Sequence, residues 1–202
     1  MEEELGYLRE TQEAAKKAGL DKCTKINRTG LEKYLKIIFP EVDDWIHDKI
    51  TNIIIDEKKC LNRPDYRSEK LKMIIEYDGL PHYQKPDIIL KDIKITKIYQ
   101  DNGYKVIRIP YFIQLTNEVV KSMFNVEVKQ QMFKPGIPSV SVEEKCTPAF
   151  LCPMGIERMA IELLKYPEQC ETNIKFLDSQ NNEELTGVKI LKEKINNIKS
   201  KI

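Results

Sequence analysis

The chain has 202 residues, with 33 Lys or Arg against 32 Asp or Glu and a formal net charge of +1. Apolar residues make up 41% and charged residues 32%, so the chain can bury a core beneath a strongly solvated surface. This balance excludes a polybasic chain or an acidic disordered one, but local clusters of charge could still bind nucleic acid.

The sequence has no features of a membrane or secreted protein. It contains no run of 18 or more apolar residues, so we expect no membrane-spanning segment. The first residues, Met1-Glu2-Glu3-Glu4-Leu5, lack the basic and then apolar order of a signal peptide, and we therefore expect a cytoplasmic protein. The five cysteines form no C-x-x-C pair, which favours packed free thiols over disulfides or a zinc site.

The first half of the chain predicts helices followed by strands. Residues 1 to about 20 predict a charged amphipathic helix. Thr29 and Glu32 form a capping box at the start of a second helix, which Phe39-Pro40 ends. The β-branched run at 53–55 and the segment 71–77 predict strands, and the polar residues between them predict a hairpin turn centred near Ser68-Glu69.

The second half is expected to be mainly helical. The spacing of Ile88, Ile95 and Ile98 predicts a helix over residues 87–102 that Gly103 ends, and the alternation in 105–109 predicts a strand. After about residue 115 we expect helices, interrupted by a turn-rich connector at 133–138. This order of elements predicts a mixed α/β core with helical additions.

Carboxylates gather at the end of the predicted strand 71–77. Glu76 and Asp78 are two residues apart, so both side chains face the same side of the strand and repel each other. A divalent ion such as Mg²⁺, bound through carboxylate oxygens, would relieve that repulsion. Asp65 could give a third carboxylate, and His82 follows the next turn. The structural alternative is a solvated strand face beside a surface histidine.

The expected hairpin makes this convergence difficult. A tight hairpin centred near Ser68-Glu69 would place Asp65 opposite Lys72, about four residues or ~13 Å along the strand from Glu76. The strands would then have to bend or splay, for instance at Pro64, before the carboxylates could meet.

The motifs of this region, taken together, resemble the PD-(D/E)XK nuclease superfamily, and within it the branch similar to very-short-patch-repair (Vsr) endonucleases. In order, they are Pro64-Asp65, then Glu76-Tyr77-Asp78-Gly79-Leu80-Pro81-His82, then Asp92, and finally Asn102-Gly103-Tyr104-Lys105-Val106-Ile107-Arg108. The resemblance covers residues 29–115. It implies a restriction-endonuclease-like α/β fold, a mixed sheet flanked by helices, with helical extensions at 1–28 and 116–202.

The resemblance also implies roles for individual residues. Asp65 and Glu76 would bind Mg²⁺ or Mn²⁺, and the carbonyl group of Tyr77 would complete the inner shell. Asp78 stands where the superfamily usually has lysine, and His82 is then the candidate general acid or base. Glu32 looks like the acidic residue that this branch places on its first core helix, where it could hold a metal-bound water or a second ion.

The implied reaction is metal-dependent hydrolysis of phosphodiester bonds in DNA, in a restriction, mobile-element or defence context. Lys94, Lys97 and Arg108 are expected to contact phosphates, with solvated surface charges as the alternative. A mismatch or strand-nicking repair nuclease and a catalytically inactive nucleic-acid-binding module are the alternative functions. A single active site cuts one strand, so double-strand cleavage would require a homodimer or two binding events.

Overall fold

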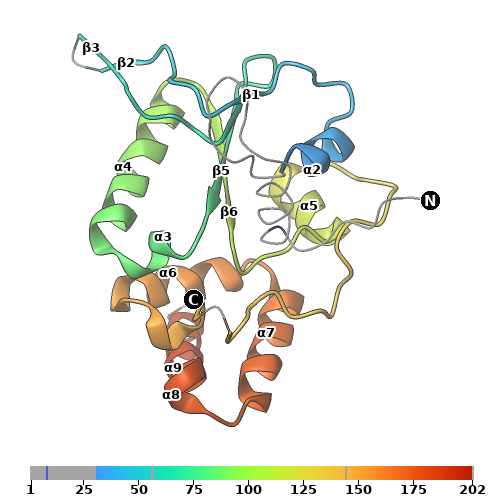
Figure 1. Ribbon diagram of the computed structural model, residues 1–202, viewed down its shortest axis with the longest axis vertical. Helices are drawn as coiled ribbons and strands as arrows, with labels where there is room; N and C mark the ends of the chain where they lie inside the picture. The colour runs from blue at the N-terminus through green and yellow to red at the C-terminus, as the bar shows by residue number, and fades with distance from the viewer. Residues whose placement is uncertain (1–7, 9–30, 56, 144, 202) are drawn as a thin grey trace. The chain divides into compact units, whose positions relative to one another are not determined.

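The computed structural model describes residue 8 and residues 31–55, 57–143 and 145–201 (Figure 1). Its contacts divide the chain into two compact units. Among the described residues, the first unit comprises those up to 77, with 95–109 and 114–134, and the second comprises those in 78–94, 110–113 and 135–201. The segment 29–115 contributes to both units, and the domain boundaries expected after residues 28 and 115 remain predictions.

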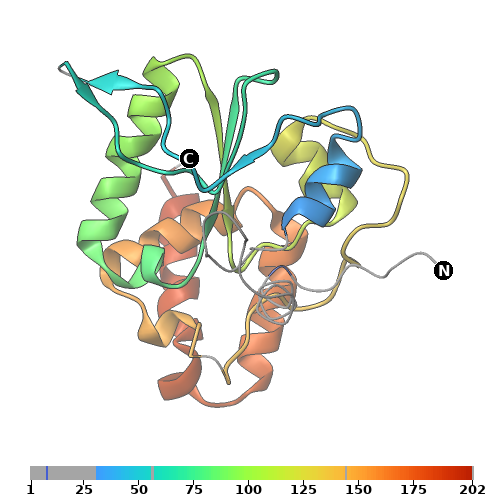
Figure 2. The same cartoon turned by 45° about the horizontal axis from the view of Figure 1, so that its top comes forward.

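The first unit contains a four-stranded mixed sheet with the order β1-β4-β5-β6. Its strands are β1 (Ile46–His47), β4 (Tyr66–Ser68), β5 (Met73–Asp78) and β6 (Lys105–Pro110), of which β5 and β6 end in the second unit. β4 pairs antiparallel with both β1 and β5. A separate short hairpin joins β2 (Ile54–Ile55) to β3 (Lys58–Lys59) (Figure 2). The expected hairpin implied that the run at 53–55 pairs with the strand at 71–77. In the structure this run pairs with β3 instead.

Helices cover the sheet of the first unit on both sides (Figure 1). On one side, α2 (Leu31–Ile38) buries four side chains at helical spacing, Leu31, Tyr34, Leu35 and Ile38. α5 (Asn117–Phe124) lies beside it, and the ring centroids of Phe39 and Phe124 are 5.7 Å apart. On the other side, the C-terminal half of α4 (Pro86–Asp101) packs Tyr99 against Ile74 of β5. A sheet between helices confirms the expected α/β class.

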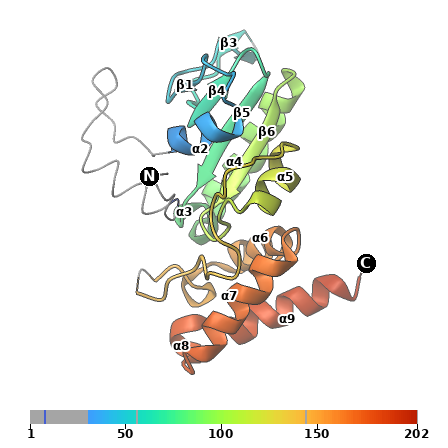
Figure 3. The ribbon, with the colours of Figure 1, turned by 90° about the vertical axis from the view of Figure 1, so that its right-hand side faces the viewer.

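The second unit is built mainly of helices (Figure 3). They are α3 (Pro81–Gln84), α6 (Pro153–Leu163), α7 (Pro167–Ser179), α8 (Glu183–Thr186) and α9 (Val188–Lys199), with a 3₁₀ turn at Pro148–Phe150. α6 packs against α3, α7 and α9. Gly155 permits the approach to α3, because a Cβ atom there would lie 1.6 Å from the carbonyl oxygen of Tyr83. The expected helical character after residue 115 is confirmed.

The β4–β5 hairpin differs from the expected one. Tyr66, Arg67 and Ser68 were expected within or beside a turn, but they form β4, which pairs Tyr66 with Ile75 and Ser68 with Met73. The turn therefore consists of residues 69–72 and is centred two residues later than expected. The local sequence pointed to a turn because these residues are polar, whereas in the fold all three are buried.

Asp44 explains why the turn lies where it does. Its carboxylate accepts a hydrogen bond from the hydroxyl of Ser68 at 2.7 Å and from the backbone N–H groups of Glu69 and Lys70, each at 2.9 Å. Lys72 then adopts a left-handed conformation, φ 47°, and leads the chain into β5. A side chain that lies 24 residues before Ser68 therefore fixes the register of the hairpin.

His82 lies within the short helix α3. The chain does not continue as a loop to His82, because Pro81 begins α3 directly after Gly79-Leu80. Apart from Leu8, the helix expected over residues 1 to about 20 lies outside the described residues, as does the Thr29 cap. None of the described helices combines the length and the apolar composition that crossing a membrane requires.

Candidate functional site

The hairpin register brings Asp65 and Glu76 together in the first unit. Continued by one residue beyond β4, the register sets Asp65 opposite Glu76. The Oε2 atom of Glu76 accepts the N–H of Asp65 at 3.3 Å, and the Oδ2 atom of Asp65 accepts the N–H of Tyr77 at 2.7 Å. No bend at Pro64 is needed, because the later turn already removes the offset between the two carboxylates.

The donor set at this pair suits a hard divalent ion. Asp65 and Glu76 are half-buried, so a hydrated cation can reach them, and both offer carboxylate oxygens. Nearby, the hydroxyl of Tyr99 is buried without a hydrogen-bond partner in the described part of the chain. Burial and then the charge of Glu76 raise the pKa of Tyr99. A buried polar group of this kind fits a site that is completed by ordered water.

Glu32 does not complete this pair into a compact group of ligands. It lies half-buried on α2. The described residues contain one close group of three or more His, Cys, Asp or Glu ligands, and neither Glu32 nor the Asp65–Glu76 pair belongs to it. The role of Glu32 in holding a water or a second ion stays a prediction.

That one group is Asp78, His82 and Asp92, and it lies in the second unit. One ligand atom from each residue lies within 4.8 Å of the others, which is compact enough for a single ion. The Nδ1 atom of His82 is 2.8 Å from Asp92 Oδ2 and 3.4 Å from Asp78 Oδ1. Asp78 is fully buried and Asp92 is 7% exposed, so both carboxylates need a positive partner.

Arg158 on α6 supplies that positive partner. Its guanidinium donates to Asp78 Oδ2 at 2.5 Å, to Asp92 Oδ2 at 2.8 Å and to Glu162 Oε1 at 3.0 Å. It also donates to the backbone carbonyl group of His82 at 3.1 Å. A cation already bonds these carboxylates, so the group holds a positive charge without a metal ion, and a bound ion would have to displace Arg158.

Burial and charge shift the titration of the residues around Arg158. Burial alone would lower the pKa of Arg158, but Tyr83, Asp78 and Glu162 outweigh it and the pKa is raised. Burial raises the pKa of Glu162 despite its bond to Arg158. Burial and then the charge of Glu162 raise the pKa of Tyr83, whose hydroxyl donates to Glu162 at 2.5 Å. The guanidinium therefore stays charged throughout the physiological range.

The hydrogen bonds of His82 define which nitrogen can transfer a proton. Both groups near Nδ1 are carboxylate oxygens, which only accept hydrogen bonds, so Nδ1 carries the proton. Nε2 has no hydrogen-bond partner within the described ranges, and the side chain is 30% exposed. An imidazole held by a carboxylate at one nitrogen and open to solvent at the other can act as a general base or acid.

The expected phosphate contacts differ in how accessible they are. Lys94 is exposed on α4 in the second unit. Lys97 is exposed in the first unit but pairs with Asp101 at 3.0 Å. Arg108 is half-buried and donates to the hydroxyl of Thr96 at 3.3 Å. Lys94 is exposed, and the exposed pair of Lys97 with Asp101 is weakly held. Both lysines are therefore better placed than the half-buried Arg108 for a phosphate contact.

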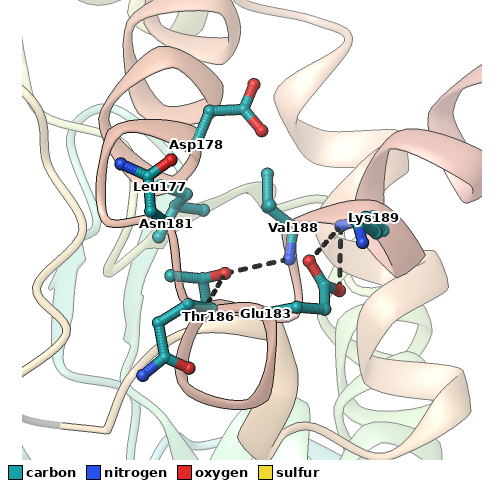
Figure 4. A pocket seen from close by; sticks show the side chains of 8 residues that line it. Leu177, Asp178, Asn181, Glu183, Thr186, Val188 and Lys189 are labelled. Carbon is teal, nitrogen blue, oxygen red and sulfur yellow. Dashed lines mark hydrogen bonds between the residues drawn. The ribbon is translucent and has the colours of Figure 1, made fainter.

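A pocket of about 350 Å³ lies in the second unit, between the end of α7, α8 and the start of α9 (Figure 4). The carboxylate of Glu183 accepts the backbone N–H of Lys189, and the hydroxyl of Thr186 accepts that of Val188. These side chains satisfy the first N–H groups of α9. The side chains that line the pocket therefore hold the junction between α8 and α9. None of the residues expected to act in the site lines it.

Sequence reasoning missed Arg158, the residue that makes the most contacts in the second-unit group. It lies 80 residues after Asp78 and outside the segment that carries the resemblance. The only local signal is the helical spacing of Arg158 and Glu162, which is typical of many surface ion pairs. Comparison with known proteins gives no further assignment, because no family model, curated protein or solved structure matches this chain.

Proposed function

We propose that this protein is a divalent-metal-dependent DNA endonuclease that hydrolyses phosphodiester bonds. The observation that carries the proposal is the cross-strand pair Asp65–Glu76, whose two carboxylates are half-buried. The backbone N–H of Asp65 orients the carboxylate of Glu76, and the backbone N–H of Tyr77 orients that of Asp65. Such a pair matches the metal-ligand positions that the resemblance to PD-(D/E)XK nucleases assigns. The restriction-endonuclease-like form of the α/β fold belongs to the same proposal.

The proposal gives separate roles to the residues of the two units. Asp65 and Glu76, with the carbonyl group of Tyr77, would hold Mg²⁺ or Mn²⁺. The chemistry that such an ion supplies when bound is activation of water and neutralisation of charge on the phosphate. His82 would move a proton through Nε2, while Asp92 holds Nδ1. Lys94 and Lys97 would contact phosphates outside the reacting group.

The test is a cleavage assay with supercoiled plasmid, nicked, mismatched and single-stranded DNA, each with Mg²⁺, with Mn²⁺ and with a chelator. We expect metal-dependent cleavage. Glu76→Gln and Asp65→Asn should each reduce the rate by about a hundredfold or more, because a lost ligand removes several kcal/mol of transition-state stabilisation. Asp43→Asn is the matched control, since Asp43 is an exposed carboxylate of the same unit and should leave the rate unchanged.

The outcomes separate the candidate functions. Retained DNA binding by Glu76→Gln in Ca²⁺, together with lost cleavage, supports the enzyme. Wild-type protein that binds DNA but cleaves none of these substrates with either metal would refute it in favour of a binding module. Cleavage confined to mismatched DNA would indicate the repair nuclease. Double-strand products whose rate rises with the square of protein concentration would indicate action as a homodimer.

A further inference from the structure

Arg158 connects four groups of the second unit, three from residues 78–92 and one from its own helix. Its side chain is 14% exposed and bonds Asp78 at the end of β5, Asp92 on α4 and Glu162 on α6. The guanidinium also lies 4.7 Å from the centroid of the Tyr83 ring. A planar group with five donors is suited to such a junction, because it holds several acceptors in fixed directions.

The two aspartates that Arg158 holds are the same two that hold His82. Asp92 Oδ2 accepts from both Arg158 and His82, each at 2.8 Å. Asp78 contacts Arg158 through Oδ2 and faces His82 Nδ1 through Oδ1. A bond between Arg158 and the backbone carbonyl group of His82 fixes the start of α3 as well. The position of the imidazole therefore depends on the guanidinium.

The charges in this group also depend on Arg158. In the described part of the chain, the charged groups paired with His82 are Asp78 and Asp92, and Arg158 and Glu162 are bonded behind them. With Arg158 present, one fixed positive charge opposes the two buried aspartates. Without it, the imidazole would face the two aspartates with that charge removed, which favours binding of its second proton.

We propose that Arg158 is a positioning residue for His82, which fixes the Nδ1-protonated imidazole between Asp78 and Asp92 and leaves Nε2 for proton transfer. The inference rests on the proposed function only for its kinetic consequence. It also makes the helical region after residue 116 a necessary part of the acid–base group, since α6 supplies the guanidinium.

The direct experiment is a nitrogen NMR titration of the imidazoles. The chain has two histidines, and His47 lies in the first unit, where its ring packs against Tyr66 with centroids 4.9 Å apart. In wild type, His82 should be the Nδ1-protonated tautomer when neutral. In Arg158→Gln, the midpoint of His82 should rise by about one pH unit or more, a tenfold gain in proton affinity. The midpoint of His47 should not move.

Two further variants make the interpretation independent of folding. Arg158→Lys keeps the charge but loses the planar fork, so it should restore most of the His82 midpoint while the tautomer is less well fixed. Asp92→Asn removes one acceptor charge and should lower the His82 midpoint. Glu157→Gln, an exposed position on the same helix, is the control and should change neither histidine.

The kinetic readout is the pH dependence of DNA cleavage. Arg158→Gln should move the acid limb of the rate profile upward by the same amount as the His82 midpoint, and Arg158→Lys should reverse that move. Either of two results would overturn the inference, even in an active nuclease. One is an unshifted His82 midpoint in folded Arg158→Gln, and the other is a raised or unchanged His82 midpoint in Asp92→Asn. A shifted midpoint in a protein that cleaves no DNA would uphold the inference and refute the proposed function.

Discussion

Replacing Asp44 by alanine tests how the turn between β4 and β5 is held. The substitution removes an acceptor from three donors, the hydroxyl of Ser68 and the N–H groups of Glu69 and Lys70, which lie 2.7 to 2.9 Å away. A hydrogen bond to a charged group contributes about 1.5 kcal/mol at the lower end of its range. Water can replace the acceptor at the exposed Lys70 N–H, so we expect a total loss of about 2–3 kcal/mol.

The measurement is urea unfolding followed by tryptophan fluorescence. The single tryptophan, Trp45, is adjacent to Asp44 and lies in the first unit, so the signal reports on the unit that the hairpin stabilises. Asp43→Ala is the matched control, because Asp43 is an exposed neighbour that pairs only with the exposed Lys70 side chain in the described structure. Its urea midpoint should stay close to that of wild type.

The pH dependence gives the same prediction a second check. Burial would raise the pKa of Asp44, but hydrogen bonds from Lys70, Ser68 and Glu69 outweigh it and the pKa is lowered. A depressed folded-state pKa contributes stability above the unfolded value of about 3.9, and this stability is lost as the pH falls through the folded value. The difference between wild type and Asp44→Ala should therefore shrink below about pH 4. Equal urea midpoints for Asp44→Ala and Asp43→Ala would refute the reasoning.

Two further predictions concern the second unit. Gly155→Ala should destabilise it by about 1–3 kcal/mol, because the added Cβ would lie 1.6 Å from the Tyr83 carbonyl oxygen. Gly79→Ala is the control, since its nearest contact would be at 3.8 Å, and it should lower the thermal unfolding temperature less. Burial raises the pKa of Tyr166 to about 12. Above about pH 10 the unfolded state loses this proton while the native state keeps it, so the free energy of unfolding falls as the pH rises. Tyr166→Phe should weaken that alkaline loss, measured as unfolding free energy from pH 9 to 11 and as tyrosinate absorbance; an unchanged slope would contradict it.

The elements that the sequence predicted well are those with a strong local pattern. α4 has apolar residues at helical spacing, and β6 alternates until Pro110. β4 was missed because its three residues are buried only in the context of the sheet, and Arg67 is 5% exposed despite its charge. The register depended on Asp44, a contact that no pattern around the turn contains.

The candidate site could be predicted in part for a similar reason. Asp65, Glu76 and His82 lie within one motif-bearing segment, so their resemblance to a known arrangement was visible along the chain. Arg158 reaches Asp78 and Asp92 through the packing of α6 on α3, which depends on the small size of Gly155. Short-range spacing gives no information on which distant helix will meet a given strand end. A resemblance confined to one segment cannot identify a partner that lies outside it.

The four-residue turn between β4 and β5 also limits how this chain can be engineered. Deleting one turn residue would slide β4 by one position and set Asp65 opposite Ile75, on the other face from Glu76. Deleting two would return Asp65 to the first face but displace it by about 7 Å. Fusion linkers and reporter peptides are therefore better inserted at the hairpin between β2 and β3, where Glu57 is exposed and no proposed ligand shares the ladder.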